Sequence, residues 1–247
     1  MPLATEGYSR NSPRMSDKPD GSFRLFRVAG INVYLHWVWF LVAYYQIVVR
    51  KNEYSTLTWN IAEYAALFGI VLLHEFGHAF ASRQVGGSAD TILLWPLGGV
   101  AYVRTPPRPA AELWSIAAGP LVNLVLAIPL IGLVMANDIN VLGRNATDLD
   151  AFIGNLCLIN GLLLVFNILP IYPLDGGQIL RSLLWFIVGP VKSLYAASIV
   201  GFIGVAALAA YAIYMRSIWM GIIAFYVFDG CRKGFLRARE ASAGGPV

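Results

Sequence analysis

Long apolar segments separated by short polar stretches make up most of this chain. Six of them predict membrane-spanning helices, at about 33–49, 57–83, 111–136, 151–169, 191–215 and 218–228. A helix needs roughly 20 predominantly apolar residues to cross a bilayer, and only the last segment is much shorter. The segments lack the strict alternation of apolar and polar positions that is typical of a transmembrane β-barrel. The pattern therefore predicts an all-α polytopic membrane protein with about six transmembrane helices.

The stretch between the second and third spans has a different pattern. Residues 89–104 are too apolar for a free cytosolic loop and too interrupted for a span. β-Branched and aromatic residues lie on both sides of a Pro-Leu-Gly-Gly bend at 96–99, which favours two short strands. Residues 23–33, just before the first span, are a further strand candidate. We therefore expect a small membrane-associated β-sheet in addition to the helices.

Composition supports one membrane-embedded unit. Hydrophobic residues make up 57% of the 247 residues and charged residues only 13%, and the mean hydropathy is +0.62. So few charges cannot cover a soluble surface, because soluble domains carry about 25% charged residues. We expect a disordered cytosolic tail over 1–22, a single membrane-embedded domain over 23–230 and a basic cytosolic tail over 231–247. With only two cysteines, a disulfide framework is excluded.

The basic residues orient this arrangement. If both termini are cytosolic, fourteen Lys and Arg residues lie inside and four lie outside, which agrees with the positive-inside rule. The topology accounts for the net charge of +4, and no nucleic-acid partner is expected. We predict a multi-pass protein of a bacterial or archaeal cell membrane, with the lipid bilayer as its surroundings.

The strongest chemical signal lies in the second span, which reads His74-Glu75-Phe76-Gly77-His78. Histidines four residues apart share one face of a helix, so both imidazoles can reach one Zn²⁺ ion, with Glu75 adjacent as general base. Given the numbers of His and Glu in the chain, chance would produce this pattern about 0.001 times. Ionisable groups within a span are also unfavourable unless they face a protein interior or a cavity. We therefore interpret His74 and His78 as metal ligands.

A catalytic zinc site needs a third protein ligand, and the best candidate follows the fourth span. Asp175 lies between a proline-rich segment at 170–173 and a glycine pair at 176–177. Prolines remove helical hydrogen bonds and glycines permit close approach, so we expect irregular backbone here. Irregular backbone at membrane depth is tolerated only where protein or a cavity covers it. Asp175 is then the third zinc ligand or, alternatively, a helix N-cap at the membrane interface.

With these two motifs, the chain resembles the site-2 protease family of intramembrane zinc metalloproteases over about residues 23–228. The resemblance implies that His74, His78 and Asp175 bind one zinc ion per chain and that Glu75 has the catalytic role. The family also carries a Gly-Pro-x-x-Asn element, which residues 119–123 match. Asn123 would then be a candidate oxyanion or substrate contact, or alternatively the partner in an interhelical hydrogen bond. Many relatives carry a PDZ or a nucleotide-sensing regulatory domain, and we expect a compact form without either.

The predicted function is an endopeptidase that cleaves transmembrane or membrane-adjacent segments of protein substrates, as in regulated intramembrane proteolysis. Zinc-activated water would be the nucleophile, and Glu75 would take its proton. The alternative is a membrane metal transporter that uses the same ligands as a transit site, which requires polar groups along a continuous path through the spans. A catalytically silent homologue is a third interpretation, which the intact Glu75 disfavours.

The expected sheet also suggests how a substrate is held. An exposed strand edge can pair with an unwound segment as an added strand, and the same region is thought to act similarly in the family that the chain resembles. The alternative is a covering loop that only seals the site. The candidate substrate-binding edge strand consists of Gly99, Val100, Ala101, Tyr102 and Val103.

Overall fold

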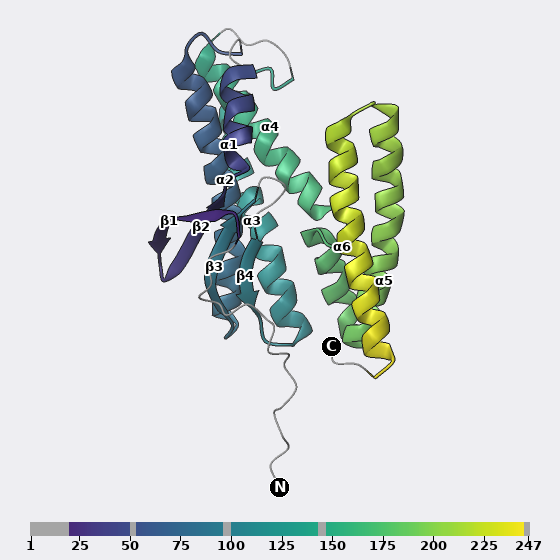
Figure 1. The fold of residues 1–247 in the computed structure, drawn as a ribbon. Helices are drawn as coiled ribbons and strands as arrows, with labels where there is room; N and C mark the ends of the chain where they lie inside the picture. Colours follow the sequence, from purple (N-terminus) through teal and green to yellow (C-terminus); the bar gives the residue numbers. More distant parts are fainter. Residues whose placement is uncertain (1–19, 50–52, 96–99, 143–146, 245–247) are drawn as a thin grey trace.

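The computed structural model describes residues 20–49, 53–95, 100–142 and 147–244, and Figure 1 shows its fold. Helices dominate the described residues, together with one small β-sheet. Four helices are long and apolar enough to cross a membrane: α2 (Leu57–Gln84), α3 (Pro109–Ala136), α4 (Asp148–Ile168) and α5 (Asp175–Tyr214). The first three agree closely with the predicted second, third and fourth spans. The predicted fold class, a mostly helical membrane protein with a small sheet, is confirmed.

The sheet has four strands, in the order β1 (Ser22–Val28), β2 (Ile31–His36), β3 (Ser88–Leu94) and β4 (Val100–Arg104). β1 and β2 form an antiparallel hairpin, β3 runs parallel to β2, and β4 is antiparallel to β3. The two strands expected within 89–104 are therefore present. β3 and β4 pack beside α2, and β4 forms one edge of the sheet as described.

The first predicted span, 33–49, is wrong in its first part. Residues up to His36 belong to β2, in which alternate side chains, Ile31, Val33 and Leu35, are buried in the core. This alternation is the period of a half-buried strand, and it lies hidden within an apolar segment. Helical structure begins at α1 (Trp39–Tyr44) and continues in the π-helical turn η1 (Tyr45–Val49). These residues rise only about 16 Å, roughly half of a bilayer core.

α5 consists of two helical segments that meet at Gly189, where φ is 81° and Pro190 follows. The second segment matches the predicted span at 191–215, whereas the sequence pattern does not predict the first, which begins at Asp175. α6 (Ile218–Ser242) continues well beyond the apolar segment at 218–228. α5 and α6 lie side by side as an antiparallel pair (Figure 1).

The segment between α4 and α5, residues 169–174, is held by the α5–α6 pair. A Cβ atom at Gly201 would lie 3.0 Å from the carbonyl oxygen of Tyr172, and one at Gly230 would lie 2.3 Å from Cγ of Pro173. The Cys231 thiol also donates to the Tyr172 carbonyl oxygen, at 2.6 Å. Small residues on α5 and α6 therefore let this irregular segment pack tightly, which fixes the position of Asp175 directly after it.

Polar contacts tie α2, α3 and α5 together at one end. Nε1 of Trp114, in α3, donates to Oε1 of Gln84 at the end of α2, at 2.9 Å. Nη1 of Arg181, in the first segment of α5, lies 3.1 Å from Oε2 of Glu112 near the start of α3. The end of α2, the start of α3 and the first segment of α5 therefore meet, and these three helices carry the predicted site residues.

Candidate metal centre

His74 and His78 lie one turn apart on α2 and are buried, with 4% and 7% of their surface exposed. Asp175 is the first residue of α5, and its Oδ2 atom lies 3.1 Å from Nε2 of His74 and 3.4 Å from Nε2 of His78. The two Nε2 atoms are 3.1 Å apart. The structure therefore brings the three predicted ligands together from two helices, with one atom of each at a common point.

The other ring nitrogens fix the protonation of both imidazoles. Nδ1 of His78 lies 2.8 Å from the carbonyl oxygen of Ser115, and Nδ1 of His74 lies 2.5 Å from Oδ1 of Asn123. The Asn123 amide nitrogen donates elsewhere, to Oδ1 of Asn160 at 2.8 Å, so its oxygen is the acceptor for His74. Each Nδ1 therefore carries a hydrogen, and in the neutral form of each ring the lone pair is then on Nε2. Metal-bound histidines are typically held by partners of this kind.

The three converging atoms fit a bound cation. In that neutral form three acceptors face one another, which is unfavourable unless a cation lies between them, and Oδ2 of Asp175 is buried without a hydrogen-bond partner among the described residues. Ligand atoms about 2.0–2.1 Å from a tetrahedral zinc ion lie about 3.3 Å from one another. The observed separations of 3.1, 3.1 and 3.4 Å agree with this spacing. Two histidines and one carboxylate form a donor set typical of catalytic zinc, with a fourth position open to water.

Gly119, in α3, lies directly against the two imidazoles. A Cβ atom built at Gly119 would be 2.3 Å from Nε2 of His78 and 2.8 Å from Nε2 of His74, close to the space that a metal ion needs. On the opposite side, a Cβ at Gly176 would be 2.1 Å from the carbonyl oxygen of Ile168. Residues without a Cβ atom therefore allow α3 to approach the histidines and the start of α5 to approach the end of α4.

The remaining predicted residues on the helices surround this cluster. Glu75 is buried, with 4% of its surface exposed, and follows His74 directly on α2. Asn123 lies beside His74 as described, and both atoms of its amide are engaged. Asn160, on α4, is 1% exposed, and sequence reasoning missed it. A carboxamide inside an apolar span is the signal that points to such a residue, because it must find a partner there.

The candidate edge strand supplies none of the three converging ligand atoms. Residues 100–103 belong to β4, whereas Gly99 lies outside the described residues. Just after the strand, the Thr105 hydroxyl lies 3.5 Å from the Ser82 hydroxyl of α2, one turn after His78. The edge strand is thus anchored to the helix that carries both histidines.

Comparison with known proteins places these residues within one protein family. The family model described as "Peptidase family M50" matches residues 62–143 and 132–211, which together cover more than half of the chain. The matched region includes the paired histidines, Asn123 and Asp175. Among solved structures, the site-2 protease from Methanocaldococcus jannaschii is similar, with a TM-score of 0.61 and 29% sequence identity over 87% of this chain and 95% of that chain.

Two curated relatives cover most of this chain but only part of their own sequences. A zinc metalloprotease of Methanocaldococcus jannaschii is 31% identical over 86% of this chain and 60% of its own length. A Synechocystis protein with the name "Putative zinc metalloprotease sll0528" is 33% identical over 74% of this chain and 49% of its own length. This chain therefore spans about half to three-fifths of the length of these relatives.

Replacement of Gly119 by alanine should weaken metal binding, because the new methyl group would occupy the space between the imidazoles. We expect a loss of about ten-fold or more in zinc affinity, the size of effect seen when groups around a metal site are disturbed. Zinc bound to purified protein, measured by mass spectrometry, checks this. Gly132→Ala is the matched control, since a Cβ on that residue of the same helix meets only open space. Equal zinc contents in the two variants would contradict the placement of the metal.

Proposed function

The chain belongs to peptidase family M50, the family of the site-2 proteases, and we propose that it is a zinc endopeptidase that cleaves transmembrane or membrane-adjacent segments of other proteins. The observation that carries this proposal is the convergence of His74, His78 and Asp175 on one buried point. The three residues lie on helices that are long and apolar enough to cross a membrane. Three acceptors in such surroundings are costly unless they bind a cation.

The ligands and the residues around them have separate tasks. We propose that His74, His78 and Asp175 hold one zinc ion per chain, which when bound supplies a Lewis acid for the scissile carbonyl and lowers the pKa of water. Asn123 and the Ser115 carbonyl oxygen keep each imidazole in the orientation and tautomer that a ligand needs. Contact of Asn123 with an oxyanion stays a prediction, because its amide bonds His74 and Asn160 in the arrangement described.

Glu75 is assigned the proton transfers. It is not one of the three converging ligands, although it follows His74 directly and is buried on the same helix. A carboxylate in this place can accept a proton from the attacking water and give it to the leaving amine. The separation of the base from the ligands means that metal binding and catalysis can be lost independently, which makes the assignment testable.

Removal of the base and removal of a ligand should have different effects. Glu75→Gln should fold and bind zinc normally but lose cleavage of a membrane-anchored reporter by at least about 100-fold, a typical loss when a general base is removed. Asp175→Ala should lose zinc as well as activity. Zinc content and reporter cleavage are measured on the same purified samples. Near wild-type cleavage by Glu75→Gln would contradict the mechanism, and normal zinc in Asp175→Ala would mean that another residue is the third ligand.

The edge of β4 is the proposed binding place for an unwound substrate segment. A helix hides its carbonyl groups, so the segment must become extended before its peptide bond can be attacked. An extended segment gains main-chain hydrogen bonds when it adds to a free strand edge. β4 offers such an edge, and the contact between Thr105 and Ser82 links it to α2.

Proline in β4 should impair cleavage without removing the metal, since proline cannot donate a hydrogen bond to an added strand. Val100→Pro or Tyr102→Pro should lower reporter cleavage by about ten-fold, while alanine at the same positions should be milder. Val100 and Tyr102 lie two apart and so direct their backbone groups to the same side. If both proline variants fold, bind zinc and cleave the reporter at the wild-type rate, strand addition at this edge is wrong.

We also propose that both termini are cytosolic, in the cell membrane of a bacterium or an archaeon. Basic residues gather where α2 ends and α3 begins, among them Arg83 and Arg108. Arg181, in the first segment of α5, lies at the same end, because it forms an ion pair with Glu112 near the start of α3. A cytosolic position of this end agrees with the positive-inside rule.

Cysteine labelling tests this orientation. Cysteines introduced at Thr5 and Ala243, in a variant without the two native cysteines, should both resist an impermeant reagent in intact cells and react after the cells are opened. A cysteine introduced at Asn140, in the connection between α3 and α4, should react in intact cells. Labelling of both terminal sites in intact cells would reverse the topology, and labelling of only one would imply an odd number of spans.

A further inference from the structure

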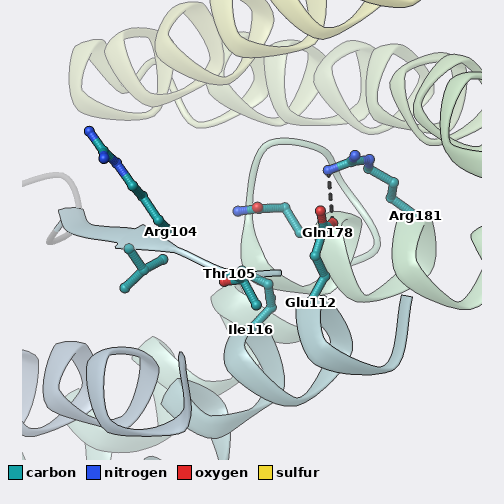
Figure 2. A pocket seen from close by; sticks show the side chains of 7 residues that line it. Arg104, Thr105, Glu112, Ile116, Gln178 and Arg181 are labelled. Atoms are coloured by element: carbon teal, nitrogen blue, oxygen red, sulfur yellow. Dashed lines mark ion pairs between the residues drawn. The ribbon is translucent and has the colours of Figure 1, made fainter. Parts of the chain in front are cut away.

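A pocket of about 540 Å³, lined by charged as well as apolar side chains, lies between the end of β4 and the helices α3 and α5. Its lining residues are Val103, Arg104, Thr105, Glu112, Ile116, Gln178 and Arg181. Figure 2 shows Glu112 and Arg181 joined by an ion pair on one side of the pocket and Arg104, from the end of β4, on the other. The pocket is therefore lined both by the proposed substrate strand and by the helices of the metal site.

Two of the lining residues adjoin groups of the metal centre. Gln178 follows the ligand Asp175 by one turn of α5, which is about 4.5 Å along the helix axis. Ile116 follows Ser115, whose carbonyl oxygen holds the His78 imidazole. A peptide added to β4 near the metal would therefore place neighbouring side chains at this pocket.

The charges of the pocket favour an acidic occupant. Glu112, the only carboxylate among the described lining residues, is half-buried and already compensated by Arg181, at 3.1 Å. Arg104 is exposed and makes no ion pair with any described residue, so the lining has one positive charge in excess. Nε of Arg181 is buried and has no acceptor among the described residues. Among the described lining residues, the Arg104 guanidinium is thus the uncompensated charge, and the carboxylate of Glu112 is already paired.

Two of the polar side chains that line the pocket are held in place. Nε2 of Gln178 donates to the carbonyl oxygen of Pro173 at 2.9 Å, which fixes its amide beside the segment that precedes Asp175. The Arg181 guanidinium lies over the Trp185 ring, 5.6 Å from its centre. Prearranged groups of this kind lose little conformational freedom when a ligand binds.

We propose that this pocket is a substrate subsite that receives an acidic side chain of the bound peptide on the side of the metal centre where α2 ends and α3 begins. The inference rests on the proposed protease function and adds a preference in substrate choice. The excess positive charge would repel a lysine side chain of the substrate, and it would add little binding energy for a neutral side chain. Arg104 is the residue that sets this preference, because its charge is not used within the described protein.

Charge exchange tests the subsite. The reporters are single-span proteins that carry Glu, Gln or Lys at successive positions on the cytosolic side of the cleaved bond. At one position, the wild type should cleave the Glu reporter about five-fold faster than the Lys reporter, the effect of a partly exposed charge pair. Arg104→Glu should reverse this order. Arg108→Glu, the same charge change at an exposed residue outside the pocket, should leave it unchanged.

A binding measurement separates this inference from the proposed protease function. The Glu75→Gln variant is expected to bind reporters without cleaving them. It should capture the Glu reporter more strongly than the Lys reporter, and addition of Arg104→Glu should reverse this preference. If the capture preference reverses in this way, the subsite is supported, even if the wild type cleaves no reporter. A lack of cleavage by the wild type would count against the protease function alone. Cleavage and capture with no charge preference at any position, or a preference that Arg104→Glu leaves intact, would overturn the subsite while the protease function stands.

A phospholipid headgroup is the competing occupant, because it is also anionic. If Arg104→Glu slowed cleavage of the Glu, Gln and Lys reporters equally, and only in phosphatidylcholine vesicles that contain phosphatidylglycerol, the pocket would bind lipid and the subsite would be wrong. The same reversal of reporter preference in pure phosphatidylcholine vesicles would support a peptide occupant.

Discussion

Three acceptor atoms within 3.4 Å of one another, buried among helices of a membrane protein, place strict demands on the packing around them. Each lone pair without a donor or a cation is unfavourable in surroundings of low polarity, so the convergence of these atoms fits a site for a bound cation. The helices must also come unusually close. A Cβ at Gly77 would lie 2.7 Å from the carbonyl oxygen of Ala118, and one at Gly119 would touch both histidines. Close contact of α2 and α3 therefore serves the metal centre directly.

The support for the ligands extends well beyond the helices that carry them. Asn123 joins His74 to Asn160 of α4, and Nδ2 of Asn160 returns a hydrogen bond of 2.9 Å to the backbone oxygen of Asn123. Asp175 is fixed from the other side, since the irregular segment before it packs against glycines of α5 and α6. The two sides of the site thus depend on different helices: the histidines on α2, α3 and α4, and the carboxylate on α5 and α6.

Local pattern made the histidine pair and the helices α2, α3 and α4 predictable, because spacing within one helix and apolar length both lie in contiguous residues. Asp175 could be proposed only from its prolines and glycines, and its meeting with the histidines is a long-range contact that spacing does not encode. The strand candidate at 23–33 covers β1 but only the first residues of β2, because alternation within an apolar segment resembles the start of a span. The first segment of α5 was missed because its glycines are poor helix formers, which close packing here overrides. The role of Asn160 could not be predicted, because it depends on which helix packs against α4 at that residue.

A second buried carboxylate on α2 differs from the candidate metal centre in its hydrogen-bond partners. Glu63 lies three turns before His74, about 16 Å along the helix, and is fully buried. Its oxygens accept hydrogen bonds from Gln46, Tyr54 and Asn155, the last at 2.8 Å, so donors surround this carboxylate. Such a network joins α2 to η1 and α4 and needs no ligand. At the candidate metal centre, Asp175 lies against two imidazoles whose Nδ1 hydrogens point away from it. The same helix therefore carries one polar group that the fold satisfies and two histidines whose Nε2 atoms, together with Oδ2 of Asp175, form a site that fits a bound cation.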